Sequence, residues 1–244
     1  MAKVRAAGNR LRHGLRGVKL SMPDDRAMLA DPRRALRVSG SLLLAALVLY
    51  LLMWFTSTRD VLQWFDDRVY GFVPHLRASW AVSAAKSLDF LGGTWCSWTL
   101  RVVVFAVLIW RRHWLHLAAF LLAVITSEAL IGTTKALIDR PRPPGSLIGT
   151  SGASFPSGHA VAAAVTAVGV VIALLPAGHT RWVWERRAAL YVSVMAMSRV
   201  FLGAHWATDV LAGALLGSGI AIGWPALLVC WRTELTDRPS PAEP

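Results

Sequence analysis

The residues of this chain that can do chemistry form three short polar islands within a hydrophobic second half. Island one is 135–143, island two is 156–159 and island three is 198–209. They supply three fixed cations, two histidines, a hydroxyl and a carboxylate, which are Lys135, Arg142, Arg199, His159, His205, Ser157 and Asp209. Ionisable side chains near a membrane core are costly and commonly functional. This inventory predicts a pocket that holds a phosphate and transfers it through an imidazole.

The cations of island one suit phosphate binding. An arginine fork can bind two phosphate oxygens, and a lysine adds a mobile point charge. Lys135 is predicted on the last turns of a helix, and the prolines at 141 and 143 end that helix, so Arg142 lies on the following loop. Snorkelling to the membrane interface would explain one such cation, but it poorly explains three beside two histidines.

Island two, Pro156-Ser157-Gly158-His159, predicts the start of a helix. Ser157 is well placed as the N-cap, and the first turn would direct free backbone N–H groups at an anion. Gly158 lets an oxygen approach the backbone closely, and His159 can donate a proton to a departing oxygen. A plain helix cap with an interfacial histidine is the alternative for this island alone.

Island three pairs a histidine with a carboxylate. His205 and Asp209 are four residues apart and therefore share a helix face. Asp209 is expected to accept a hydrogen bond from one ring nitrogen, which fixes the tautomer and leaves the other nitrogen free to attack. A metal site would need more ligands, and the nearby Lys and Arg side chains repel a cation. We therefore predict no metal and no cofactor.

Together the islands resemble the three-part signature of the type 2 phosphatidic acid phosphatase (PAP2) superfamily, which is related to the vanadium haloperoxidases. The matching segments are Lys135-x6-Arg142-Pro143, Pro156-Ser157-Gly158-His159 and Ser198-Arg199-x5-His205-x3-Asp209. The resemblance covers about 115–230 and implies a metal-independent lipid phosphatase.

The resemblance also implies a role for each signature residue. His205 would be the nucleophile that forms a phosphohistidine, Asp209 would orient it, and His159 would be the general acid. The phosphate oxygens would be held by Lys135, Arg142, Ser157, Gly158 and Arg199. Pro156 and Ser198 would support these residues from behind.

Three charged residues near island one have no place in the signature. Glu128 lies seven residues before Lys135, about two helical turns, so the two share a face. We predict that Glu128 faces the bundle interior and helps to line the region below the site; a protonated, packed glutamate is the alternative. Asp139 and Arg140 are predicted to belong to a solvated loop.

The elements that must position the islands are hydrophobic helices. The 244 residues have a mean hydropathy of +0.48 and only 16% charged residues, against about 25% in soluble proteins. We predict an all-α, polytopic membrane helix bundle with a PAP2/haloperoxidase-like core. About six spans are expected, at 38–57, 98–110, 114–138, 158–175, 188–202 and 206–229.

The predicted organisation is one transmembrane domain, 38–231, between a basic tail, 1–37, and a short tail, 232–244. The catalytic core is 115–230. Residues 58–96 interleave aromatic and charged side chains, which is typical of helices at a membrane interface. Within them, 80–91 contains Lys86 and Asp89 and looks too short and too charged to span.

The distribution of charge predicts the orientation. Ten of the 26 Lys and Arg residues lie in the first 37, and in a six-span topology the excess falls on the side of both tails. The positive-inside rule then puts both termini in the cytoplasm and all three islands at the outer, or periplasmic, face of a bacterial plasma (inner) membrane. The basic tail would contact anionic lipid or act only as a topology signal, so we predict no nucleic-acid partner.

The sequence therefore predicts an enzyme that hydrolyses a lipid phosphate or diphosphate at the outer face. Polyprenyl diphosphate, phosphatidic acid and phosphatidylglycerol phosphate remain open as substrates. The alternatives are a lipid phosphotransferase with the same intermediate, a haloperoxidase, which the apolar spans disfavour, and a non-catalytic membrane binding or transport protein. Gly213 and Gly217, and Gly219 and Gly223, are spaced for close helix contact. Packing within one chain is expected, and a homodimer is the alternative.

Overall fold

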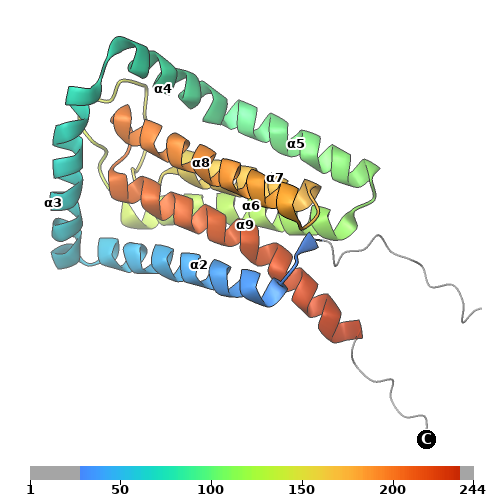
Figure 1. The fold of residues 1–244 in the computed structure, drawn as a ribbon. Coiled ribbons are helices and arrows are strands. Elements are labelled where there is room, and N and C mark those ends of the chain that lie inside the picture. Colours follow the sequence, from blue (N-terminus) through green and yellow to red (C-terminus); the bar gives the residue numbers. More distant parts are fainter. Residues whose placement is uncertain (1–27, 237–244) are drawn as a thin grey trace, which may run out of the picture.

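The computed structural model describes residues 28–236, so 1–27 and 237–244 of the predicted tails lie outside the described residues. The all-α prediction is confirmed, since residues 28–236 contain helices and no strand (Figure 1). The bundle is built from α2 (Pro32–Trp54), α6 (Trp114–Ile138), α7 (Gly158–Leu174), α8 (His179–Phe201) and α9 (Ala207–Thr236). The helix α3 (Thr56–Phe72) crosses one end of it, followed by the 3-10 turn η2 (Val73–Leu76), α4 (Ser79–Gly92) and α5 (Thr94–Trp110).

Three helices of the described range, α2, α6 and α9, are each long and apolar enough to cross a membrane. The pair α4 and α5 passes the same test together, with a bend of 45° between them. The apolar segment is therefore longer than the predicted span at 98–110. The helix α5 already begins at Thr94, and α4 precedes it along the bundle on the other side of the bend (Figure 1). Of the two charges that argued against a span, Asp89 pairs with Arg199 of α8. The count of six spans stays a prediction.

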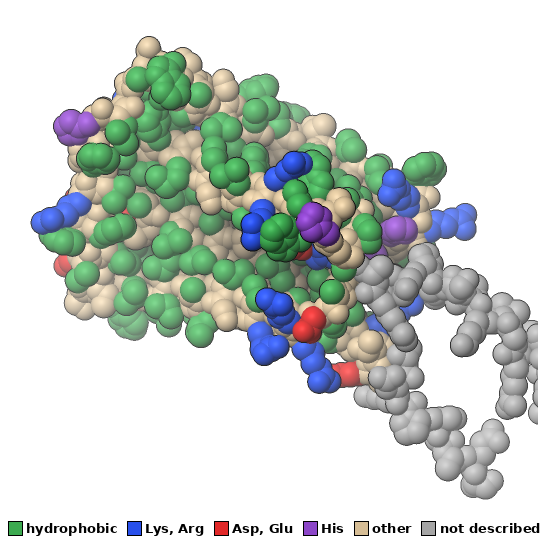
Figure 2. Space-filling model, in the orientation of Figure 1, with side chains coloured by type: hydrophobic (Ala, Val, Ile, Leu, Met, Phe, Trp, Pro, Cys, Tyr) green, Lys and Arg blue, Asp and Glu red, His purple; other side chains and the backbone are tan. Residues whose placement is uncertain are grey.

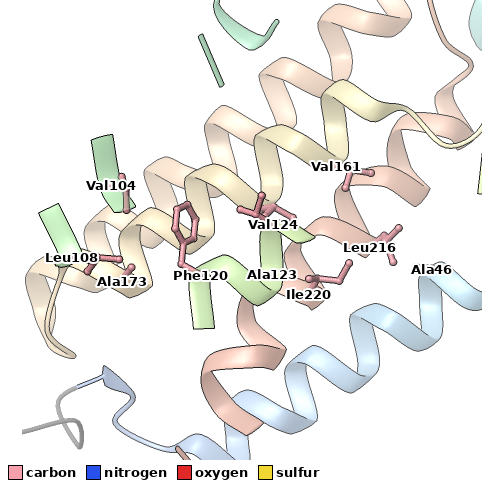
Figure 3. Close-up of a cluster of buried hydrophobic side chains, with 11 residues drawn as sticks. Ala46, Val104, Leu108, Phe120, Ala123, Val124, Val161, Ala173, Leu216 and Ile220 are labelled. Carbon is pink, nitrogen blue, oxygen red and sulfur yellow. The ribbon is translucent and has the colours of Figure 1, made fainter. Parts of the chain in front are cut away.

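The main core lies where α5, α6, α7 and α9 meet. Figure 3 shows Phe120 of α6 among Val104 and Leu108 of α5 and Ala173 of α7. Leu216 and Ile220 of α9 continue the same cluster. Because lipid tails are as apolar as these side chains, the helices are held together by dense van der Waals packing rather than by exclusion of water.

The glycine stripes of α9 allow this close packing within one chain. A Cβ added at Gly213 or Gly217 would lie 2.7 Å from the carbonyl oxygen of Ser157 or 2.6 Å from that of Val161, both on the α7 side. Gly219 and Gly223 contact α2 in the same way, through Leu43 and Ser39. The spacing thus serves packing inside the chain, and nothing supports the homodimer alternative.

A leucine at Gly217 is expected to destabilise the bundle strongly, because backbone cannot move aside as a flexible side chain can. Overpacking typically costs about 1–3 kcal/mol, so we expect the thermal midpoint to fall by about 5–10 °C. Gly132→Leu is the matched control, since nothing lies within 4 Å of a Cβ there. Equal midpoints for the two variants, measured in detergent, would show that the α7–α9 contact is not tight.

The two ends of the bundle differ in what they carry. The first residue of α2 and the last turn of α9 lie at one end, while α3 and the loops around 139–157 and 202–206 lie at the other (Figure 1). The islands therefore gather at the end away from both tails. The membrane face of each end stays a prediction.

Candidate active site

The structure brings the three islands together at one end of the bundle. Lys135 is on the last turn of α6, His159 is on the first turn of α7 and Arg199 is on the last turn of α8. His205 lies on the loop that leads into α9, whose first turn holds Asp209. His159 is within electrostatic range of Arg199, His205 and Lys135. Four helix ends and the loop 139–157 thus form one cluster.

His205 is held in one orientation by both ring nitrogens. Its Nδ1 lies 2.8 Å from the carbonyl oxygen of Ser154, and its Nε2 lies 3.2 Å from Nη1 of Arg142. A carbonyl oxygen can only accept, so Nδ1 carries the proton. Nε2 then keeps its lone pair, and it faces the cation that is predicted to bind phosphate.

Asp209 acts differently from the sequence-based expectation. Its Oδ2 lies 3.6 Å from Nδ1 of His205, too far for a hydrogen bond, and Ser154 takes the predicted place of acceptor. The carboxylate instead accepts from the Trp206 N–H at 2.9 Å and from Ser154 Oγ at 2.5 Å. This ties the start of α9 to the loop. At 3.6 Å its charge still favours an imidazolium on His205.

Burial of His205, which is 4% exposed, lowers the pKa of its imidazole below the ordinary value of 6.5, although nearby Asp209 opposes the shift. The predicted role of nucleophile needs a neutral ring, so a lowered pKa would keep His205 competent at mildly acidic pH. We expect the His205 resonances to titrate with a midpoint below 6.5 in ¹⁵N NMR, identified by their loss in His205→Ala. The acid limb of kcat/KM should not lie above that midpoint. A midpoint at or above 6.5 would contradict the effect of burial.

Arg142 is fixed by backbone carbonyl groups. Its guanidinium donates to the carbonyl oxygens of Ser151, Gly152 and Ala204 at 2.8–2.9 Å. Since these contacts occupy most of its N–H groups, the fork is positioned before any ligand arrives. The remaining Nη1 contact, to His205 Nε2 at 3.2 Å, points this fork toward the place where a phosphate beside His205 would lie.

Two other predicted phosphate ligands, Ser157 and Lys135, have side chains without a hydrogen-bond partner among residues 28–236. Ser157 occupies the N-cap position of α7, but its buried Oγ has no hydrogen-bond partner and makes no capping bond. Lys135 has neither a hydrogen bond nor an ion pair with any residue between 28 and 236. At Gly158, a Cβ would meet only Ile131, at 3.9 Å, so the backbone is open to a ligand. An anion at this helix start would satisfy all three.

Arg199 is buried and paired with a residue that sequence reasoning did not assign to the site. It forms an ion pair with Asp89 of α4, and Ser198 Oγ accepts from its guanidinium at 3.3 Å. The same Asp89 oxygen lies 3.5 Å from Nε2 of His159. Ser198 thus contacts Arg199, and its supporting role stays a prediction. A carboxylate inside an apolar segment was the signal for Asp89. Pro156 joins buried Phe155 to the start of α7.

The prediction that Arg140 belongs to a solvated loop is wrong, because its side chain is buried. Only 2% of it is exposed. It donates to Asp209 at 2.5 Å and to Asp66 of α3 at 2.7 Å. Asp66 also accepts from the Thr208 N–H at 3.0 Å. The helix that crosses the end of the bundle therefore locks the first turn of α9. Asp139, in contrast, is exposed.

Glu128 does not face the interior as predicted. Its side chain is 42% exposed and pairs at 2.7 Å with Arg101 of α5, which is buried. Arg101 also donates to Thr166 of α7 at 2.9 Å. With Thr166, the pair links α5, α6 and α7. Within residues 28–236, no group of three His, Cys, Asp or Glu side chains is placed to hold a metal ion.

Comparisons with known proteins identify one family. The model of the PAP2 superfamily matches residues 116–234. Phosphatidylglycerophosphatase B of Bacillus subtilis (strain 168) is 31% identical over 160 residues, which cover 62% of this chain and 77% of that protein. Undecaprenyl-diphosphatase of Sulfolobus acidocaldarius is 43% identical over 68 residues, 28% of this chain and 30% of that protein.

Two solved structures share the fold. The crystal structure of the first transmembrane PAP2 type phosphatidylglycerolphosphate phosphatase from Bacillus subtilis has a TM-score of 0.68 and 24% identity, and it covers 82% of this chain and 98% of its own. The crystal structure of Aquifex aeolicus LpxE has a TM-score of 0.53 and 21% identity, over 64% of this chain and 91% of its own.

Proposed function

This chain belongs to the PAP2 superfamily, and we propose that it hydrolyses a lipid phosphate or diphosphate through a phosphohistidine on His205. The observation that carries the proposal is the state of His205. Its Nδ1–H is held by Ser154, and its unprotonated Nε2 faces Arg142. Among residues 28–236, the Lys135 amine and the Ser157 hydroxyl have no hydrogen-bond partner. This is the arrangement that an in-line attack on a phosphate requires.

The proposed reaction has two steps. Nε2 attacks phosphorus, the bond from phosphorus to the leaving oxygen breaks, and His159 gives that oxygen its proton. Water then attacks the phosphohistidine, gives a proton to His159 and breaks the bond from phosphorus to nitrogen. Lys135, Arg142 and Arg199 stabilise the charge on the transferring group. Asp209 stabilises the positive charge that develops on the ring of His205.

The signature residues are proposed to bind the phosphate group, which all candidate substrates share. The lipid portion must therefore distinguish one substrate from another. Two relatives are named for phosphatidylglycerophosphate and undecaprenyl diphosphate, so both, with phosphatidic acid, are the substrates to test. Purified protein in detergent with EDTA should release inorganic phosphate from at least one of them. Activity lost with EDTA alone would overturn the metal-independent step. Transfer of the phosphoryl group to an added alcohol, without release, would make the protein a phosphotransferase.

We further propose that the site lies at the outer face of the plasma membrane with both termini in the cytoplasm. The excess of Lys and Arg on the tail side and the position of the islands at the other end support this orientation. In a variant without Cys96 and Cys230, an impermeant maleimide should label Thr150→Cys in spheroplasts. Glu234→Cys should be labelled only after lysis. The reverse pattern would invert the topology.

Asp89 is expected to act through His159, whose proton the leaving group needs. Asp89→Asn would remove the negative charge beside the imidazole, and we expect kcat to fall by up to about 100-fold for a lipid phosphomonoester, a poor leaving group. A diphosphate leaves more easily and should lose less than about 5-fold. Ser87→Ala on the same helix is the control. Equal losses on both substrates would mean that Asp89 only holds Arg199 in place.

A further inference from the structure

A second cavity lies away from the active site, between α2, α8 and α9. It has a volume of about 740 Å³. Apolar side chains line most of it, among them Val38 of α2, Val192 of α8 and Leu215 of α9. Figure 2 shows this face, with Lys and Arg side chains gathered toward the end of the bundle at which α2 begins.

The depth of this groove matches one leaflet of a bilayer. It is lined mainly by 31–42, which begins one residue before α2, by 181–193 of α8 and by 211–222 of α9, and Val168 and Ile172 of α7 also contribute. At a rise of 1.5 Å per residue, stretches of twelve or thirteen residues span about 16–18 Å. Half of the hydrocarbon thickness is about 15 Å. Because α8 carries Arg199 at its other end, the groove belongs to the leaflet opposite the active site.

The polar end of the groove offers one uncommitted cation. Arg181 is satisfied by Glu185 at 2.8 Å and by the carbonyl oxygen of Met28. Asp31 caps α2 by accepting from the Arg34 N–H at 2.8 Å. The guanidinium of Arg34 has neither a hydrogen bond nor an ion pair within 28–236. Trp182 lines the groove at the same level, where an indole suits the head-group region.

We infer that this groove binds one anionic phospholipid of the opposite leaflet, with its acyl chains along α9 and its phosphate at Arg34. Inside a bilayer, an open apolar groove of this depth is filled by hydrocarbon, and the cation selects the charge of the head group. The preceding segment of this chain, 1–27, is strongly basic. It therefore suits neither the apolar walls nor Arg34.

The site is tested by native mass spectrometry of the full chain, delipidated in mild detergent and titrated with dioleoyl phosphatidylglycerol. Vanadate is present to occupy the active site. We expect one tightly bound lipid per chain and a thermal midpoint raised by about 5 °C. Arg34→Ala should weaken binding about 5-fold. Arg33→Ala, with the same charge on the same helix but outside the groove, should change it less than 2-fold.

A second pair of variants tests the apolar part. Ala214→Trp fills the floor of the groove and should abolish the bound lipid and the rise in midpoint. Ala129→Trp, on an exposed part of α6, should keep both. Phosphate release by all four variants should stay within 2-fold of wild type. Absence of a lipid adduct, equal loss in the two arginine variants, or a dimer in place of the adduct would each overturn the inference.

Discussion

His205→Ala is expected to lower kcat for the best lipid substrate by about 10⁴-fold or more. Removal of a nucleophile leaves only the rate that binding and charge stabilisation provide. Here Nε2 is the one unprotonated nitrogen that faces the cations, and no other described side chain takes its place. The measurement is phosphate release at equal protein concentration, together with the loss of an acid-labile phosphorylated enzyme in a rapid quench with ³²P substrate.

A matched control separates chemistry from folding. His179 is an exposed histidine at the far end of α8, stacked on Trp182, and His179→Ala should retain activity within about 2-fold. Both variants should show the thermal midpoint of the wild type within about 2–4 °C. If His205→Ala kept more than about 1% of the activity, the phosphohistidine route would be wrong.

Asp66→Ala is expected to lower both the stability of the protein and its kcat. Asp66 and Arg140 are both buried, and Arg140 also pairs with Asp209. Removing one partner of a buried ion pair commonly costs about 3–5 kcal/mol, which corresponds to a fall in thermal midpoint of about 10 °C. We expect kcat to fall by about 100-fold as well, since an unbalanced Arg140 would draw Asp209 away from His205.

The neighbouring carboxylate supplies the control. Asp67 is exposed, and within residues 28–236 its carboxylate bonds only to Gln63, at 2.8 Å, so Asp67→Ala should be nearly neutral. The double variant Asp66→Leu/Arg140→Leu should recover neither the stability nor the activity, because it leaves the buried carboxylate of Asp209 without its ion-pair partner. Comparable midpoints for Asp66→Ala and Asp67→Ala would show that α3 does not brace the site.

The parts of the site that were predictable are those whose residues lie close together in sequence. His205 and Asp209 are four apart, and island two begins a helix, so each local arrangement follows from helix geometry. The convergence of the islands followed from span counting, since each island falls at the same end of its helices. The helical class followed from composition and length.

The residues that were missed depend on contacts between distant segments. Asp66 and Asp89 lie on α3 and α4, outside the segment that matches the family model, and no local pattern connects them to Arg140 or Arg199. Glu128 shows a related limit, since a seven-residue spacing fixes a shared face but not the direction in which it points. The span at 98–110 was too short because hydropathy alone does not recognise a helix bent at Gly93.

The glycine contacts between α7 and α9 have a consequence for how the enzyme responds to its membrane. Ser157 N–H donates to the Asp209 carbonyl at 3.1 Å, and the two backbones touch at Gly213 without an intervening side chain. A helix adapts to a thicker or thinner bilayer by tilting, and these two can tilt only as one body. His159, the proposed general acid, and Asp209, whose charge lies beside His205, then keep their separation while the outer helices adjust. Turnover should therefore vary little among nanodiscs made from lipids of 14 to 20 carbons, even where the thermal midpoint changes.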